Sequence, residues 1–182
     1  ALTQAQTNAQ AGQMAEQAAR AGQFGYGVVD DLGGTISGQL SVLQTGQPAP
    51  VGLKTPLGVF HGLLHVTSAQ TYSIHGVIRL PSGSSGAGKW DYGAQQTSFV
   101  GAVEVLGKVS WVGQETGDNV SQQAQGAGVV RYTDGRQYAG EYRTVGQGDQ
   151  VQLFRHGWGV SYDAKGAVEQ AGQFANDDLK TR

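Results

Sequence analysis

Three histidines offer metal-ligating chemistry in this sequence. His61 and His65 are four residues apart, which places both on one face of a strand, and His75 lies on the expected return strand. Imidazoles that meet across a hairpin can bind a transition metal. No carboxylate lies nearby in sequence to orient them, so we interpret all three as polar residues of a half-exposed sheet face. We predict no metal and no cofactor, and leave a metal at these histidines as the open alternative.

The segment Pro81–Trp90 contains the glycines and the lysine of a phosphate-binding loop. Such a loop requires Ser or Thr directly after the lysine to reach magnesium, but Trp90 follows Lys89. Neither a preceding parallel strand nor a following helix is indicated around it. We therefore interpret the segment as a flexible loop between structural units.

The carboxylates do not form a pattern that predicts catalysis. Asp30-Asp31 lies where a hairpin is expected to turn, and Asp177-Asp178 lies in an expected solvated tail. The chain has no cysteine and no Gly-x-Ser-x-Gly nucleophile motif. We therefore predict that the protein has no catalytic residues and is not an enzyme.

Large apolar side chains are the better candidates for a functional surface. Aromatic residues on a thin sheet are natural anchors for a protein partner. The candidate interaction residues are Trp90, Trp111, Tyr138, Tyr142, Trp158 and Met14. Because sugars also stack on indole rings, Trp90, Trp111 and Trp158 support an alternative, a carbohydrate-binding module or glycan-acting enzyme.

The elements that position these residues follow from a pattern that is repeated near the C-terminus. Gly126–Tyr142 and Gly157–Phe174 each open with Gly-x-Gly, pass an aromatic residue, turn at a polar-Gly pair and close with Gly-x-aromatic. Each unit predicts a β-hairpin, and Asp134-Gly135 predicts a two-residue type I′ turn. A single hairpin is unstable in water, so consecutive units must pair edge to edge.

This pattern resembles the MORN repeat (membrane occupation and recognition nexus). Looser matches occur at Gly25–Leu40, Gly62–Ile78 and Thr97–Val103. The resemblance implies one elongated antiparallel sheet of stacked hairpins that serves in non-catalytic binding or oligomerisation, with lipid binding claimed for some members. The closing glycines Gly38, Gly76, Gly101, Gly140 and Gly172 are unevenly spaced. Uneven spacing predicts extra residues between units, at 41–57, 80–92, 104–125 and 143–156.

The chain divides into an arm at 1–23, a mostly β hairpin array at 24–175 and a tail at 176–182. The arm is rich in Ala and Gln, which favour a helix of about five turns, interrupted near Gly12. Because its apolar face is only alanine-deep, we expect weak binding to its own sheet and docking on a neighbouring subunit. A partly disordered leader is the alternative.

Four arginines of the hairpin array are interpreted as part of a solvated sheet face: Arg131, Arg136, Arg143 and Arg155.

Charge and composition narrow the class of protein. The 182-residue chain has a formal net charge of −2, so no nucleic-acid partner and no membrane contact are expected, and a lipid-surface module is a weaker alternative. The absence of Cys and the start at Ala1, consistent with signal cleavage, favour a periplasmic or secreted location over the cytoplasm. We expect a non-catalytic interaction or scaffold protein that self-associates or is a subunit of a larger bacterial envelope or secretion-related assembly.

Overall fold

The computed structural model describes residues 2–21, 25–29, 34–38, 46, 48–54, 57–68 and 71–181. Within them, one α-helix precedes a thirteen-stranded sheet in which every strand pairs with the next strand along the chain. The pairs are antiparallel, which confirms the predicted mostly β fold of sequential hairpins. The elements are α1 (Leu2–Ala21), β1 (Gly25–Val29), β2 (Gly34–Gly38), β3 (Ala49–Lys54), β4 (Val59–Val66), β5 (Tyr72–Arg79), β6 (Ser85–Tyr92), β7 (Gln96–Val105), β8 (Val109–Asp118), β9 (Gln123–Tyr132), β10 (Gln137–Val145), the 3-10 helix η2 (Gly148–Gln150), β11 (Gln152–Tyr162), β12 (Val168–Ala175) and β13 (Asp178–Thr181).

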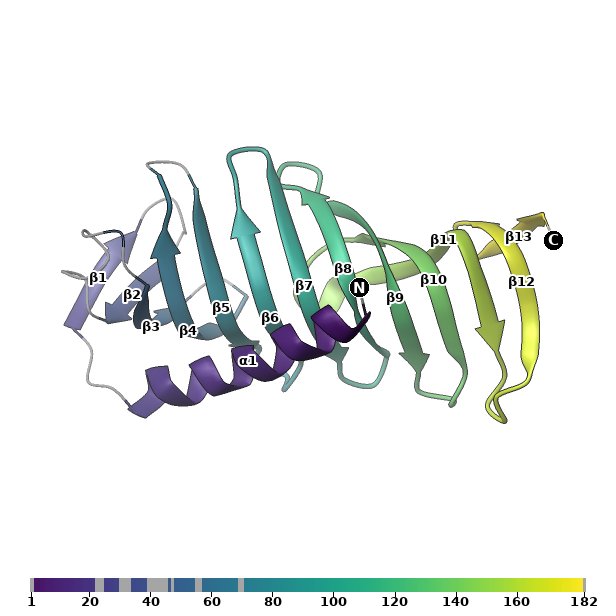
Figure 1. Ribbon diagram of the computed structural model, residues 1–182, viewed down its shortest axis with the longest axis horizontal. Helices are drawn as coiled ribbons and strands as arrows, with labels where there is room; N and C mark the ends of the chain where they lie inside the picture. Colours follow the sequence, from purple (N-terminus) through teal and green to yellow (C-terminus); the bar gives the residue numbers. More distant parts are fainter. Residues whose placement is uncertain are drawn as a thin grey trace.

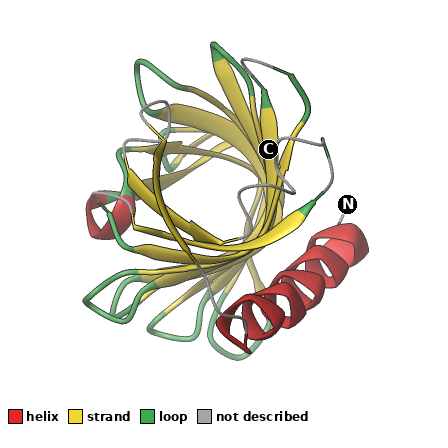
Figure 2. Cartoon of the chain, turned by 90° about the vertical axis from the view of Figure 1, so that its left-hand side faces the viewer, coloured by secondary structure: helices red, strands yellow, loops and turns green. Residues whose placement is uncertain are grey.

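The sheet is long and strongly curved. Its strands stand side by side along the long axis of the molecule, and α1 crosses β3 to β8 on one face (Figure 1). Seen along that axis, the strands curl around an open centre with α1 outside the curl (Figure 2). We call the face that carries α1 the outer face and the opposite, concave face the inner face.

A row of glycines crosses the sheet, one from each strand between β4 and β12. Each member pairs with the next in the strand register, so the row is continuous. This glycine row consists of Gly62, Gly76, Gly88, Gly101, Gly113, Gly128, Gly140, Gly159 and Gly172. On the inner face it makes room for aromatic rings. A Cβ added to Gly76 would lie 2.8 Å from Cζ of Phe60, and one added to Gly101 would lie 2.9 Å from Cζ of Phe99.

The glycine row overturns the expectation of inserted segments. The ranges 80–92 and 104–125 contain β6 and β8, which are ordinary members of the sheet. The closing glycines are unevenly spaced because Gly101 and Gly140 are three strands apart, whereas Gly140 and Gly172 are two strands apart. Pro81–Trp90 is likewise not a flexible loop, because Gly83 (φ 97°) makes a tight turn and β6 follows it. The range 143–156 holds the end of β10, η2 and the start of β11, while 41–57 lies partly outside the described residues.

The turn at Asp134-Gly135 differs from the predicted type I′ geometry. Gly135 has a φ of 91°, but Asp134 is not among the described residues with positive φ. The N–H of Gly135 donates to the carbonyl of Tyr132 at 3.1 Å, and the N–H of Tyr132 donates to the carbonyl of Arg136 at 3.0 Å. This is the pattern of a three-residue loop with one glycine bulge. The Asp134 carboxylate accepts the N–H of Arg136 at 3.0 Å, which favours the longer loop.

Helix α1 confirms the predicted helix of about five turns, but it is continuous through Gly12, so the expected interruption was wrong. It packs on its own sheet, and docking of the arm on a neighbouring subunit stays a prediction. A Cβ added to Gly12 would lie 2.6 Å from the carbonyl oxygen of Gly76 and 2.8 Å from the nitrogen of Gly88. Helix and sheet backbones therefore meet directly at this point. Alanine side chains are long enough to fill the remaining gap, so a shallow apolar face is sufficient to pack the helix on the sheet.

Short contacts on both sides of Gly12 fix the position of the helix. Ala9 is buried against Val77 and Ala87 on the outer face. One turn further on, Glu16 accepts two hydrogen bonds from the guanidinium of Arg79, at 2.7 and 2.9 Å. The Arg79 side chain is half-exposed, so this ion pair contributes at most about 1 kcal/mol and mainly sets the register of the helix.

The inner face carries the two larger hydrophobic clusters. The first gathers buried residues of β3 to β5, with Phe60 and Leu64 near its centre, and Trp90 packs against it. The second extends from β7 to β12 and contains Trp111, Tyr138 and Tyr142. The predicted tail at 176–182 contains the β12–β13 turn and the short strand β13.

Candidate binding groove on the inner face

A groove of about 970 Å³ lies on the inner face between the two clusters. Its wall is mostly apolar, with residues from β4 to β10 and from the loops at both ends of the strands. Strand alternation explains the composition, because each residue two positions from a row glycine points to the same face as that glycine. The aromatic residues of the wall are Phe60, Tyr72, Trp90, Tyr92, Phe99 and Trp111.

The rings around the groove pack against one another rather than standing alone. Trp90 lies with its ring centre 4.7 Å from that of Phe99 and 6.0 Å from that of Phe60. Tyr72 and Tyr92 are stacked, with centres 4.6 Å apart, and burial raises the pKa of Tyr92 to about 12. Such ring pairs add about 0.5–1.5 kcal/mol each beyond the area they bury. The groove wall is therefore a rigid, preformed surface.

Of the acidic residues along this wall, Glu115 lies on the same strand as Trp111 and is held from both sides. Nε1 of Trp111 and the hydroxyl of Tyr142 both donate to Oε1 of Glu115, each at 2.9 Å. Burial raises the pKa of Glu115 above its usual range, and the two hydrogen bonds oppose that shift. Within the described residues, no fully buried side-chain nitrogen or oxygen lacks a hydrogen-bond partner. Since the two bonds of Glu115 both go to Oε1, Oε2 is not fully buried, and Glu115 lines the groove. Glu115 thus presents one hydrogen-bond acceptor to a bound molecule.

The β10–β11 loop (146–151) closes part of the groove. Asp149 in this loop accepts hydrogen bonds from the hydroxyls of Ser84 at 2.6 Å and Ser82 at 2.9 Å, which hold its pKa below the usual value. Nζ of Lys108 donates to the backbone carbonyl of Asp149 at 2.7 Å. These bonds join the loop to the β5–β6 and β7–β8 turns. We call this set of contacts the clasp.

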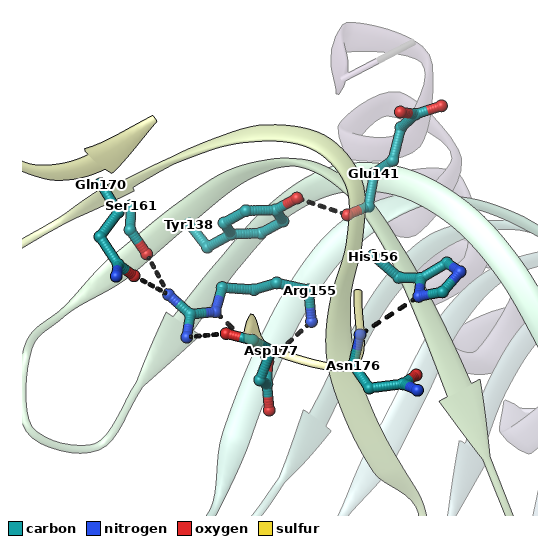
Figure 3. A network of polar contacts seen from close by, with 8 residues as sticks. All are labelled: Tyr138, Glu141, Arg155, His156, Ser161, Gln170, Asn176 and Asp177. Atoms are coloured by element: carbon teal, nitrogen blue, oxygen red, sulfur yellow. Dashed lines mark hydrogen bonds and ion pairs between the residues drawn. The ribbon is translucent and has the colours of Figure 1, made fainter. Parts of the chain in front are cut away.

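At the C-terminal end of the sheet, a polar network centred on Arg155 holds β11, β12 and the β12–β13 turn together (Figure 3). Its Nη1 donates to Ser161 at 2.9 Å and to Gln170 at 3.1 Å, and its Nη2 donates to the backbone carbonyl of Asp177 at 2.7 Å. Asp177 also receives the backbone N–H of Arg155 at 2.8 Å. The expectations that Arg155 belongs to a solvated face and that Asp177 is simply solvated were therefore wrong. The network is structural, because its donors and acceptors satisfy one another.

The predicted interaction residues separate into two groups. Trp90 and Trp111 line the groove, and the ring centre of Tyr142 lies 6.3 Å from that of Trp111. Tyr138 is fully buried nearby, where its hydroxyl donates to the carbonyl of Glu141. Trp158 is 59% exposed on β11, and Met14 is 71% exposed on α1. Neither of these two lines the groove.

Sequence reasoning missed Glu115 and the clasp. A usable signal for Glu115 existed, because Trp111, Gly113 and Glu115 alternate along one strand and must share a face. Asp149 gave no signal, since its partners lie more than 40 residues away in the chain.

The three histidines are not brought together as a metal site. Nε2 of His75 lies 3.1 Å from the backbone carbonyl of Asn8, so this side chain helps to hold α1. No group of three or more potential metal ligands occurs in the part of the chain that the structure describes.

Comparisons with protein-family models, with curated proteins and with solved structures found no match for this chain. Within the described residues, no helix combines the length and hydropathy required of a membrane-spanning segment.

Proposed function

We propose that this chain is a non-catalytic binding protein whose inner groove holds an elongated apolar ligand. The observation that carries the proposal is the preformed groove of about 970 Å³ with a mostly apolar wall, in which Trp111 and Tyr142 hold the carboxylate of Glu115. Pockets of this size and composition are the usual places for small-molecule binding. The ligand we expect has a long apolar part and a hydrogen-bond donor, such as an ammonium or hydroxyl group, that reaches Oε2.

The acidic residues of the groove support binding rather than catalysis. A glycosidase requires two carboxylates that face each other across the substrate. Asp118 instead accepts the backbone N–H groups of Val120 and Ser121 in the β8–β9 turn, both at 2.8 Å. Glu104 alternates with the inward residues Val103 and Val105, so it belongs to the opposite face. Glu115 therefore has no catalytic partner among these residues.

The apolar wall also favours this ligand over a sugar. A sugar has hydroxyl groups on all sides, which call for several polar side chains around it. Here many of the polar side chains stand in the loops, such as Ser68, Asn119 and Gln147. The aromatic rings on the strands are accompanied by aliphatic residues such as Leu64, Ile74 and Val103, and most of the exposed wall is apolar. The sheet of consecutive hairpins agrees with what the MORN resemblance implies, and kinship with that family stays a prediction.

The proposal can be tested with three ligands that share a dodecyl chain and differ in their head group. We expect dodecylammonium and dodecanol to bind saturably below their aggregation concentrations, observed by tryptophan fluorescence, and dodecanoate to bind less tightly. Glu115→Ala should weaken binding of the ammonium about tenfold, since a hydrogen bond to a charged group contributes roughly 1.5–3 kcal/mol. Trp158→Phe is the control, because Trp158 does not line the groove.

A blocking variant tests the location. An added Cβ at Gly86 would lie 3.4 Å from Trp90 and 3.5 Å from Ile78, which are ordinary contacts, so a larger side chain is accepted and extends into the groove. Gly86→Leu should therefore fold and lose binding. If Gly86→Leu binds as tightly as the parent chain, or if none of the three ligands saturates, the proposal is wrong.

A further inference from the structure

The β10–β11 loop leaves the sheet and reaches turns that are far away along the chain. The ladder between the two strands ends at the pair Val145 and Gln152. Beyond it, η2 lies across the open centre of the curl from α1 (Figure 2). There Asp149 meets the β5–β6 and β7–β8 turns through the clasp. The loop, which lines the groove, thus bridges two separate parts of the curled sheet.

Side chains make the polar connection between the loop and these turns. The clasp depends on the side chains of Ser82, Ser84 and Lys108. The backbone bonds of the loop lie elsewhere: the N–H of Gly146 donates to the carbonyl of Gln122 at the base of the loop, at 3.0 Å, and two further bonds close the turn of η2. Among the described residues, no backbone-to-backbone hydrogen bond joins the loop to either turn. The loop can therefore separate from both turns while every ladder of the sheet stays intact.

Two glycines provide a hinge for such a movement. Gly146 has a φ of 92° and Gly148 a φ of 59°, both in the left-handed region that favours glycine. Lids commonly move by changes of backbone dihedral angle at a few residues next to the end of a strand or helix. These two glycines lie between the last residue of β10 and Asp149, which is where the loop has to bend.

The receiving side of the clasp is held by bonds of its own. The hydroxyl of Ser84 accepts the N–H of Leu106 at 3.1 Å, and the hydroxyl of Ser82 accepts the N–H of Ser84 at 3.3 Å. Neither bond involves the loop. The two hydroxyls therefore stay in place when Asp149 leaves, so the same contact can form again.

In the closed position the loop covers apolar parts of the groove wall. A Cβ added to Gly148 would lie 3.2 Å from Cδ2 of Leu80 and 3.3 Å from Cδ2 of Leu57, so the loop backbone lies directly on these two groove residues. At the other end of the loop, Val151 packs against the cluster that contains Trp111, which is only 4% exposed. Movement of the loop would uncover the wall at both places.

The strands of the wall have less freedom to move than the loop. Trp90 packs against Phe60 and Phe99, and the ladders that join β4 to β7 are continuous. An apolar chain that passed between these rings would break packed contacts and strand pairing together. The loop has only the clasp and its contacts with the leucines to release, so it is the mobile part of the groove.

We propose that the β10–β11 loop is a lid that the clasp holds closed over the bound ligand, and that release of the clasp lets the apolar chain enter and leave. This inference rests on the proposed binding of an elongated apolar ligand in the groove. It adds that the clasp sets the rate of ligand exchange. Because the lid opens before both entry and release, a change in the clasp alters the two rate constants in the same direction and changes affinity less than either.

The test ties the lid down with a covalent tether. The chain has no cysteine, so the variant with Ser82→Cys and Asp149→Cys offers only these two thiols. Dibromo-m-xylene joins the two side chains across the clasp, and benzyl bromide alkylates each of them separately as the matched control. We expect both rate constants for dodecylammonium, measured by stopped-flow fluorescence, to be about tenfold or more lower in the tethered chain, because opening precedes both steps. Equal rate constants in the two preparations would overturn the proposal.

Asp149→Ala removes the clasp without a tether. It should raise both rate constants of the parent chain about threefold or more, since the lid is then open for a larger fraction of the time. Asp163→Ala is the control, because Asp163 accepts the N–H groups of Lys165 and Ala167 in the β11–β12 turn, both at 2.9 Å, and does not line the groove. It should leave both rate constants unchanged. If Asp149→Ala also leaves them unchanged, the clasp does not hold a lid.

A measurement without ligand separates this inference from the proposed function. In the double-cysteine variant that also carries Trp158→Phe, acrylamide quenching reports on Trp90 and Trp111, the two groove tryptophans. Quenching should be weaker in the tethered chain than in the alkylated chain. If this difference is found while no dodecyl ligand binds, the lid movement stands and the proposed ligand is wrong. If ligands bind but quenching is the same in both preparations, the lid is wrong and the groove stands.

Discussion

Helix α1 should be unusually sensitive to any side chain at Gly12. A Cβ there would lie 2.6 and 2.8 Å from two backbone atoms of the sheet, far inside the roughly 3.5 Å at which carbon contacts become favourable. Neither backbone atom belongs to a flexible side chain, so the helix itself must move away. Gly12→Ala improves helix propensity by about 1 kcal/mol, against an overpacking cost of about 1–3 kcal/mol. Gly12→Val adds two methyl groups more and should cost clearly more than it gains.

The contacts that hold the helix are weak enough for this to undock it. The buried methyl groups of Ala5, Ala9 and Ala15 contribute about 0.8 kcal/mol each, or roughly 2 kcal/mol together. The pair between Glu16 and half-exposed Arg79 adds at most about 1 kcal/mol. A clash of 2–3 kcal/mol therefore offsets these contacts. We expect Gly12→Val to release α1 while the sheet stays folded.

Hydrogen exchange followed by mass spectrometry measures this directly. Amides of residues 2–21 should lose protection in Gly12→Val, while those of β5 to β10 keep it. Gln13→Ala is the matched control, because Gln13 is exposed and the substitution raises helix propensity without approaching the sheet. Equal protection of residues 2–21 in Gly12→Val and Gln13→Ala would refute the seating of the helix through Gly12.

Three further predictions concern the inner face and the array. The clasp should weaken in acid. Because the folded pKa of Asp149 lies below 3.8, the stability that its carboxylate contributes is present above that pH and is lost as pH falls through the folded pKa. The difference in urea midpoint between the parent chain and Asp149→Ala should therefore shrink between pH 6 and pH 3. Glu115 has the opposite sign. Because its folded pKa lies above 4.5, the stability of the parent chain falls as pH rises through that range. Glu115→Gln should therefore gain stability relative to the parent chain between pH 4 and pH 7, measured by urea unfolding, and an equal difference in stability at the two pH values would contradict the shift. Gly140→Val should lower stability by about 1–3 kcal/mol in thermal melts, because its Cβ would lie 3.0 Å from the hydroxyl of Tyr138 and its φ is 152°; an unchanged melt would count against the glycine row.

The sequence predicted the architecture because hairpin signals are local. The Gly-x-Gly openings, the aromatic residues and the polar-Gly turns each act over fewer than ten residues, and antiparallel pairing of neighbours then follows. Gly140 and Gly172 do lie in the second strands of their hairpins, as the repeated pattern indicated. The prediction failed at β6 and β8, which carry Trp90 and Trp111 but lie between the segments that were matched to the repeated pattern, so they were assigned to insertions.

The candidate site was harder to predict because it depends on curvature. Alternation places Trp90, Trp111 and Tyr142 on one face, but only the curl of the sheet makes that face a groove. The clasp joins Asp149 to Ser84 across 65 residues, which no local pattern indicates. The packing of α1 on its own sheet was not predicted for a related reason. Its shallow apolar face is sufficient only because the sheet beneath it presents glycines, which the sequence of the helix alone does not show.

The glycine row explains how one thin sheet packs rings on one face and a helix on the other. A missing side chain on the inner face lets a ring such as Phe60 or Phe99 lie against the strands, which builds the groove wall. On the outer face the close approach depends on Gly12 of α1, because a Cβ added there would meet the carbonyl oxygen of Gly76 and the nitrogen of Gly88. A Cβ added at Gly76 or Gly88 would instead meet the neighbouring strand and the ring of Phe60 or Phe99. Substitutions at Gly12 and in the row therefore test the two faces of the sheet separately.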